Sequence, residues 1–171
     1  MEEFVVLVNE DDNQTGLMEK QQAHVAGLLH RAFSVFIFNS KGELMLQQRA
    51  ASKYHSPTLW TNTCCSHPRV NETYIEAAHR RLVEEMGFDC SLTFSFSFIY
   101  KASLDNGLTE HELDHVFIGT FDGEPNLNKD EVMDYRWVEM EDLKNDISKN
   151  PQHYTAWFKI IFNHYLSHIE R

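Results

Sequence analysis

The chain has 171 residues, the length of a single domain, and its 42% apolar and 24% charged residues are typical of a globular protein. This composition excludes a globally disordered, collagen-like or fibrous protein. The 26 acidic residues outnumber the 15 basic ones, and the formal charge of −11 argues against a nucleic-acid partner, although a few clustered cations can still bind a small anion. We expect one domain over residues 1–171.

The cysteines and the first residues of the chain indicate its compartment. Cys64, Cys65 and Cys90 are odd in number and two of them are adjacent, which is a poor disulfide framework and indicates a reducing compartment. The first three residues include two glutamates where a signal peptide needs positive charge, and the apolar run Phe4–Val8 is too short to cross a bilayer. We therefore expect a cytoplasmic protein without a membrane partner.

Strands dominate the first part of the chain. β-branched and apolar runs predict strands at Phe4–Val8, Phe33–Phe38 and Glu43–Gln48, and turn residues join the last two into a hairpin. The segment Asn9–Gly16 is rich in turn residues. Prolines at positions 57 and 68 interrupt Ala50–Pro68, which we expect to be irregular.

The second part of the chain combines strands with three helices. Good helix formers, charges at i,i+4 spacing and a following glycine predict a helix at Thr73–Met86. The remaining predicted strands are Phe94–Ala102, Glu110–Phe121 and Tyr135–Glu139, and the remaining predicted helices are Glu141–Ser148 and Thr155–Ile169. This pattern favours an α+β sandwich.

Two short motifs carry side chains suited to catalysis or metal binding. Cys65 lies two residues before His67, so the pair can act as nucleophile, metal ligand or acid–base group, or be an inert thiol beside a surface histidine. Glu110 and Glu112 project from the same face of a predicted strand, and His111 from the other. Adjacent carboxylates are costly unless a cation or proton lies between them; a solvated strand face is the alternative.

Three histidines can join these motifs in one metal site. His24 and His30 precede the strand at Phe33, and His67 supplies a third imidazole. With Glu110 and Glu112 they offer nitrogen and oxygen ligands that suit Mn, Fe or Zn better than Mg, although spacing alone does not require this grouping. We assign the remaining histidines to the surface: His55, His79, His111, His115, His153, His164 and His168.

The predicted helix and the loop before it resemble the Nudix box, G-x5-E-x7-R-E-U-x-E-E-x-G-U, where U is a bulky apolar residue. Here the stretch is Ser66-x5-Glu72-x7-Arg80-Arg81-Leu82-Val83-Glu84-Glu85-Met86-Gly87-Phe88. In that motif, carboxylates hold divalent cations against a diphosphate. Ser66 replaces the first glycine and Arg81 replaces a glutamate, which should weaken multi-metal binding and diphosphate hydrolysis. An ordinary amphipathic helix with ion pairs is the alternative.

These departures, together with the Cys-Ser-His-Pro loop, resemble one branch of the Nudix superfamily, the type I isopentenyl-diphosphate isomerases. The resemblance extends from about Val5 to the final helix. The matching stretches are Glu19-Lys20-x3-His24, His30-x-Ala32-Phe33-Ser34, Arg49-Ala50-x-Ser52-Lys53, Trp60-Thr61-Asn62-x2-Cys65-x-His67-Pro68, Arg80-Arg81-x3-Glu85-x-Gly87, Glu110-x-Glu112 and Asp130-Glu131-Val132-Met133-Asp134-Tyr135.

The resemblance implies an α/β/α sandwich with a mixed sheet and a C-terminal helix. It also implies interconversion of isopentenyl and dimethylallyl diphosphate. Such an isomerase protonates one end of a carbon–carbon double bond and removes a proton on the far side, through a carbocation-like species. By resemblance Cys65 and Glu112 are the acid–base pair, in an order that the sequence leaves open, and Tyr100 assists the carboxyl group.

The resemblance also implies two cation sites and a diphosphate site. The expected ligands of one divalent metal, Mn²⁺, Zn²⁺ or Mg²⁺, are His24, His30, His67, Glu110 and Glu112. Glu85 would hold a Mg²⁺ that bridges to the diphosphate, and Lys20, Arg49, Lys53 and Arg81 match the anion-binding positions. Trp157 matches a tryptophan that closes over the substrate and stabilises positive charge, or it is a core aromatic. Glu84 has no assigned role, and we expect Cys64 to be structural.

Two other functions remain open from the sequence. A Nudix diphosphate hydrolase is disfavoured by Arg81, which stands where the box has a glutamate. A non-catalytic metal-dependent binding module on the same scaffold is disfavoured because Cys65, Glu112 and the expected metal ligands are all present. We expect a monomer, because no strongly apolar helix face is evident.

Overall fold

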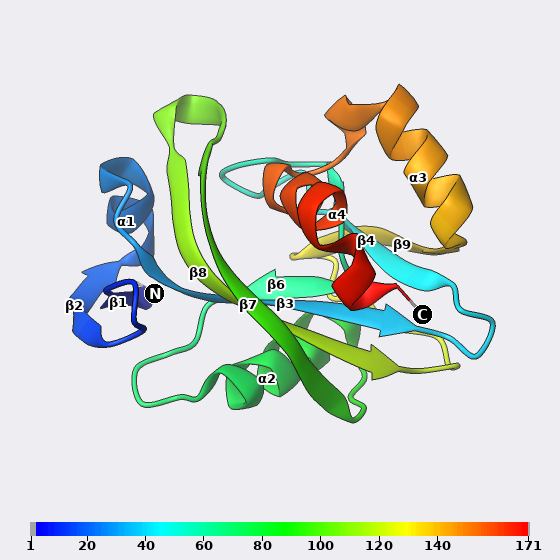
Figure 1. Cartoon of the computed structure of the whole chain (residues 1–171), viewed down its shortest axis with the longest axis horizontal. Coiled ribbons are helices and arrows are strands. Elements are labelled where there is room, and N and C mark those ends of the chain that lie inside the picture. Colours follow the sequence, from blue (N-terminus) through cyan, green and yellow to red (C-terminus); the bar gives the residue numbers. More distant parts are fainter. Residues whose placement is uncertain (1–2, 171) are drawn as a thin grey trace.

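The structure, a computed structural model that describes residues 3–170, places a mixed sheet between helices (Figure 1). Helix α2 (Tyr74–Met86) covers one face of the sheet, and α3 (Met140–Lys149) and α4 (Ala156–Ile169) lie on the other. The short helix α1 (Lys20–Ala26) lies beside β1 and β2. The expected α/β/α sandwich with a C-terminal helix is confirmed.

Strand β3 (His30–Phe38) is the centre of the sheet. Along one edge it pairs in parallel with β8 (Thr109–Thr120), from His30 opposite Glu112 to Phe38 opposite Thr120. Its other edge pairs in turn with three antiparallel strands, β1 (Phe4–Val8), β6 (Cys64–Ser66) and β4 (Leu44–Arg49). The remaining strands extend this arrangement: β2 (Gln14–Glu19) pairs with β1, β5 (Trp60–Thr61) and β9 (Val132–Val138) with β4, and β7 (Leu92–Ser103) with β8.

Both faces of β3 are covered, which explains its uninterrupted apolar sequence. Phe33, Val35 and Ile37 pack into the core under α2, and Phe36 and Phe38 pack into the core under α4. The two faces of the sheet also separate the adjacent cysteines of β6. Cys64 is buried in the α2 core, as expected of a structural residue, and Cys65 packs against the opposite core.

Helix α2 begins and ends at strong local signals. Thr73 and Glu76 form a reciprocal capping box at its start. Gly87 ends it with a φ of 72°, and a Cβ there would lie 2.3 Å from the backbone oxygen of Asn126, so only glycine fits. The buried face of α2 carries alanines and Leu82, but also Glu85, which is 4% exposed. The carboxylate of Glu85 is therefore buried between α2 and the sheet.

Six short elements were not predicted from the sequence. The turn-rich segment Asn9–Gly16 ends earlier than predicted, because β2 begins at Gln14, and α1 follows it directly. The stretch Ala50–Pro68 is mostly irregular but contains β5 and β6. Two short 3-10 helices connect longer elements: η1 (Asp105–Gly107) joins β7 to β8, and η2 (Pro151–His153) lies between α3 and α4. Within residues 3–170 the longest helices are too short or too polar to span a bilayer.

Candidate active site

One pocket collects most of the side chains that the sequence singled out. Its lining includes the expected residues Lys20, Arg49, Lys53, Cys65, His67, Arg81, Glu85, Glu110, Glu112 and Trp157. The other three, His24, His30 and Tyr100, are buried behind this lining and contact its carboxylates. The fold therefore brings all of the expected residues to one place.

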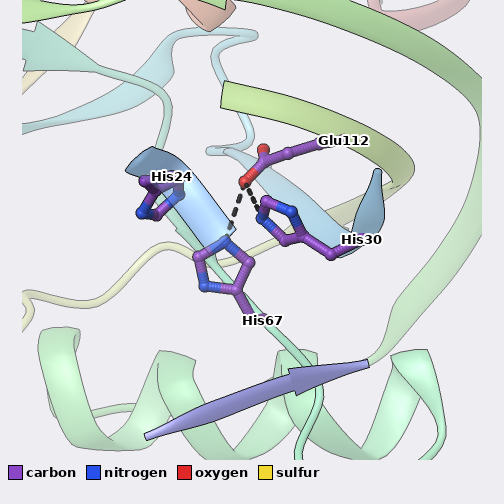
Figure 2. Close-up of side chains that lie close together, drawn as sticks. All are labelled: His24, His30, His67 and Glu112. Carbon is purple, nitrogen blue, oxygen red and sulfur yellow. Dashed lines mark hydrogen bonds and ion pairs between the residues drawn. The ribbon is translucent and has the colours of Figure 1, made fainter. Parts of the chain in front are cut away.

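The central group of this site joins three histidines to one carboxylate (Figure 2). The parallel register of β3 and β8 sets His30 beside Glu112, with His30 Nε2 3.2 Å from Glu112 Oε2. His67 follows β6 and brings its own Nε2 to 2.8 Å from the same oxygen. His24 of α1 completes the group, with its ring 5.3 Å from that of His30 and 5.8 Å from that of His67.

The burial and the hydrogen bonds of these rings are those of a site that can bind a cation. Nδ1 of His30 donates to the carbonyl oxygen of Leu28 at 2.8 Å, so in the neutral ring Nε2 is a lone pair facing the Glu112 carboxylate. Nε2 of His24 is buried without a hydrogen-bond partner in residues 3–170. Burial lowers the pKa of His24 to about 3 and also lowers the pKa of His67, which disfavours imidazolium. Neutral imidazoles and carboxylates fit a divalent metal.

A second carboxylate extends the site. Oε1 of Glu110 lies 3.8 Å from Nε2 of His24 and 3.6 Å from Nε2 of His55. The assignment of His55 to the surface is wrong, because the side chain is buried, with an exposed fraction of 5%. The residue before it, Tyr54, places its hydroxyl 2.6 Å from Nδ1 of His24. Tyr54 and His55 directly follow the Arg49–Lys53 stretch. This position next to predicted anion-binding residues was the only sequence signal that placed them near the site.

Tyr100 of β7 links the two carboxylates. Its hydroxyl lies 2.7 Å from Oε2 of Glu110 and also contacts Oε1 of Glu112. Burial, and then the charge of Glu112, raises the pKa of Glu110. Burial also favours the neutral form of Glu112, but contacts with His30 and His67 outweigh it and lower that pKa. One phenolic proton cannot serve two carboxylates, so the pair requires a further proton or a cation.

Cys65 faces the same pocket from the other side of β3. It lies on β6 and Glu112 lies on β8, and both line the pocket. Burial raises the pKa of the Cys65 thiol, and the nearby carboxylates Glu85 and Glu110 add to this effect. The thiol is therefore protonated at neutral pH. The pocket is therefore lined by a thiol and a carboxyl group that come from strands at opposite edges of β3.

The other end of the pocket is lined by cations. Nζ of Lys20 pairs with Glu3 at 2.8 Å, and Nζ of Lys53 pairs with Glu131 at 2.5 Å. Arg49 donates to the backbone oxygens of His55 and Ser56, and its guanidinium lies over Trp157, 5.2 Å from the ring centroid. The cations expected from the sequence are thus gathered on an otherwise acidic protein.

Helix α2 contributes a cation and a carboxylate to this end. Nη2 of Arg81 lies 2.6 Å from Oε2 of Glu85 and 3.4 Å from Oε2 of Glu131. Gln47 of β4, which the sequence analysis did not identify, donates to Oε1 of Glu85 at 2.9 Å. Burial opposes the charge of Arg81, but Glu85 and Glu131 outweigh it and raise the pKa of the guanidinium. A buried carboxylate beside fixed cations can hold Mg²⁺ against an anion.

Three other residues of the Nudix-like stretch, Glu72, Arg80 and Glu84, form ion pairs with one another. Arg80 binds Glu72 through two hydrogen bonds of 2.7 and 2.9 Å, and binds Glu84 at 2.7 Å. The Glu84 side chain is 38% exposed and is not part of the pocket lining. These pairs tie the loop that carries His67 to α2.

The chain matches a family model described as the NUDIX domain over residues 28–158. It is 58% identical to "Isopentenyl-diphosphate Delta-isomerase 2" of Photorhabdus laumondii over 163 residues, which cover 95% of this chain and 92% of that protein. It is 54% identical to "Isopentenyl-diphosphate Delta-isomerase" of Pectobacterium atrosepticum, covering 92% of this chain and 88% of that protein.

Solved structures with low sequence identity share the fold. DR0079 of Deinococcus radiodurans has a TM-score of 0.78 at 21% identity, covering 95% of this chain and 99% of that one. A MutT protein of Methanosarcina mazei has a TM-score of 0.66 at 18% identity, covering 81% and 94%. These similarities confirm the α/β/α sandwich and concern the fold alone.

Proposed function

Because this chain belongs to the isopentenyl-diphosphate Delta-isomerase family of NUDIX-domain proteins, we propose that it interconverts isopentenyl diphosphate and dimethylallyl diphosphate in the pocket described above. The chain is an intramolecular isomerase that shifts a carbon–carbon double bond. One observation carries the assignment of the site: Cys65 and Glu112 line one buried pocket from strands on opposite sides of β3.

The proposed reaction needs one proton delivered and one removed. A proton added to the terminal CH₂ carbon of isopentenyl diphosphate leaves a tertiary, carbocation-like centre at the neighbouring carbon. Loss of a proton from the CH₂ group on the other side of that centre forms the double bond of dimethylallyl diphosphate. Because burial keeps the Cys65 thiol protonated and the Tyr100 hydroxyl donates to the Glu112 carboxylate, the pocket offers one group that can deliver a proton and one that can accept it.

We propose His24, His30, His67, Glu110 and Glu112 as ligands of one divalent metal, which is Mn²⁺, Zn²⁺ or Mg²⁺. Such a metal withdraws electron density from a coordinated carboxyl group and makes it a stronger acid. The orphaned Nε2 of His24 and the lone pair of His30 that faces Glu112 support this assignment. Tyr100 orients the catalytic carboxyl group through its hydroxyl.

The cationic end of the pocket is the proposed diphosphate site. Lys20, Arg49, Lys53 and Arg81 would bind the phosphate oxygens, and Glu85 would hold a Mg²⁺ between them. Trp157 is 3% exposed and lines the same pocket, where its ring can stabilise positive charge without trapping it. The guanidinium of Arg49 lies 5.2 Å from the centroid of this ring, so the proposed sites for the diphosphate and the hydrocarbon adjoin each other.

We further propose that the protein acts as a monomer in the cytoplasm. The cysteines of the described chain, Cys64, Cys65 and Cys90, are free thiols, which supports a reducing compartment. The large exposed apolar side chains are spread over β1, β2, α1, α2, β7, β9 and two loops. Light scattering coupled to size exclusion tests the monomer, and a mass of two chains would refute it.

The function is tested by proton NMR of isopentenyl diphosphate in D₂O with the protein and Mg²⁺. We expect dimethylallyl diphosphate that carries deuterium, without release of phosphate. Phosphate release without migration of the double bond would instead identify a diphosphate hydrolase. An unchanged substrate in the presence of metal-loaded protein would leave only a binding function.

A further inference from the structure

The loop Tyr54–Ser56 is held rigidly against the site. Arg49 donates to the carbonyl oxygens of His55 at 3.1 Å and Ser56 at 3.2 Å, and the backbone N–H of Ser56 donates to Oδ1 of Asp105 at 3.0 Å. Ser56 adopts a φ of +49°, an uncommon conformation for a residue with a side chain. Because both sides of the loop are anchored, the His55 side chain has a fixed place.

The His55 side chain lies beside His24, a member of the proposed metal site. His55 is buried, and its ring packs edge-on against His24 at 5.5 Å and against Trp157 at 5.8 Å. Its Nδ1 lies 3.2 Å from the hydroxyl oxygen of Ser56. Its Nε2 faces Oε1 of Glu110 at 3.6 Å, which is too long for a hydrogen bond.

His24 faces the same oxygen of Glu110. Its Nδ1 is bound by the hydroxyl of Tyr54, and its buried Nε2 has no hydrogen-bond partner in the described chain. One ligand atom from each of His24, His55 and Glu110 lies within 4.8 Å of the others. His24 also belongs to the group with His30, His67 and Glu112, so the two groups share a member.

We propose that His55 is a further metal ligand, which completes a set of four imidazole nitrogens and two carboxylates. This inference rests on the proposed metal site and adds a ligand outside the set that the sequence predicts. Tyr54 acts as a positioning residue, because its hydroxyl fixes the outer nitrogen of His24. A fourth nitrogen favours Mn²⁺, Co²⁺ or Zn²⁺ over Mg²⁺, which prefers oxygen ligands.

The test compares metal binding by wild type, His55→Ala and His55→Gln after removal of metal by a chelator. Free Mn²⁺ is measured by EPR during titration, and pulsed EPR of the bound ion reports its nitrogen ligands. We expect both variants to bind Mn²⁺ at least tenfold more weakly than wild type, and to lose the coupling of one imidazole nitrogen. His55→Gln retains most of the packing against Trp157, so a loss shared by both variants is not a folding defect.

The control is His79→Ala, because His79 pairs with Asp89 at 2.6 Å on the outer side of α2 and is not part of the pocket lining. Wild-type affinity and unchanged nitrogen couplings in both His55 variants would overturn the inference. The D₂O assay on wild type separates this result from a failure of the proposed function. A wild type that isomerises the substrate while the His55 variants bind Mn²⁺ normally refutes the ligand alone. Weakened Mn²⁺ binding without isomerisation by wild type supports the ligand and refutes the function.

Discussion

Arg81 and Glu85 form an ion pair of 2.6 Å across one turn of α2, inside the pocket that carries the proposed chemistry. In the Nudix box the position of Arg81 is a glutamate. One metal-binding carboxylate has therefore been replaced by a cation, which lies beside the remaining carboxylate of Glu85. The same face of the helix can therefore hold both a cation at Glu85 and a phosphate oxygen at Arg81. This exchange suits binding of an intact diphosphate.

Arg81→Gln should raise the KM for isopentenyl diphosphate by roughly 10- to 100-fold, because a hydrogen bond to a charged group contributes about 1.5–3 kcal/mol. It should also lower the free energy of unfolding, since Glu85 loses its charged partner. Steady-state kinetics and urea denaturation measure both effects. Arg31→Gln is the control, because Arg31 pairs with Asp12 outside the pocket. An unchanged KM for Arg81→Gln would refute the phosphate-binding role.

Cys65→Ala should reduce turnover by at least a factor of about 10², the range expected for loss of a general acid or base. Metal content and folding should stay the same, because the change removes only a thiol at the pocket surface. Cys64→Ala is a matched control from the other face of β6 and should lose stability while it retains turnover. Near-wild-type turnover of Cys65→Ala would remove the thiol from the mechanism.

Glu112→Gln should lose both turnover and metal affinity. The amide cannot donate an acidic proton, and a neutral oxygen is a weaker ligand for a divalent cation. Turnover and Mn²⁺ titration are measured on the same preparation. Glu84→Gln, which changes a carboxylate on the more exposed side of α2, should leave both unchanged. Full metal affinity in Glu112→Gln would show that this carboxylate is not a ligand.

Tyr100→Phe should lower kcat by roughly 10- to 100-fold with little change in metal content. Its hydroxyl contacts both Glu110 and Glu112, and a hydrogen bond to a charged group contributes about 1.5–3 kcal/mol. Tyr74→Phe removes another half-buried phenol, which donates to Asp12 at 2.9 Å outside the pocket. If both variants keep the wild-type kcat, Tyr100 has only a packing role.

The Glu72–Arg80 pair should make a pH-dependent contribution to stability. Its hydrogen bonds to Arg80 lower the pKa of Glu72, so the stabilisation is present above the carboxyl pKa of the unfolded chain and is lost as pH falls through the lowered pKa. Glu72→Gln should therefore be less stable than wild type by about 1 kcal/mol at pH 7. Urea denaturation at pH 7 and at pH 3 tests this. A difference that stays constant with pH contradicts the ionic origin.

Local sequence patterns predicted the elements with strong periodic or capping signals. The predicted strand Phe94–Ala102 alternates, and α2 has both Thr73 and Gly87 at its ends. The strand β2 was missed because its residues are mostly exposed and do not alternate. Helix α1 has only seven residues, and it depends on the Glu19 side chain at its start and on Gly27 at its end.

The grouping of the site was predicted through family resemblance, and its geometry required tertiary structure. That Glu110 and Glu112 share a face follows from the period of a strand. That His30 lies beside Glu112 depends on the register between β3 and β8, which no local pattern specifies. The burial of His55 depends on Arg49, Asp105 and Trp157, which come from other parts of the chain, and the sequence assignment failed for that reason.

The parallel pairing of β3 and β8 also has a consequence for the order of folding. His30 and Glu112 are 82 residues apart in the chain, and a parallel pair cannot be closed by a hairpin. Contacts between such distant segments form late and slowly, since the chain must first lose the entropy of a long loop. We therefore expect the nascent chain to complete the proposed metal site only after β8 has been synthesised and has paired with β3. Ion capture would then report the pairing of β3 with β8, and metal binding would add its free energy to the stability of that long-range contact.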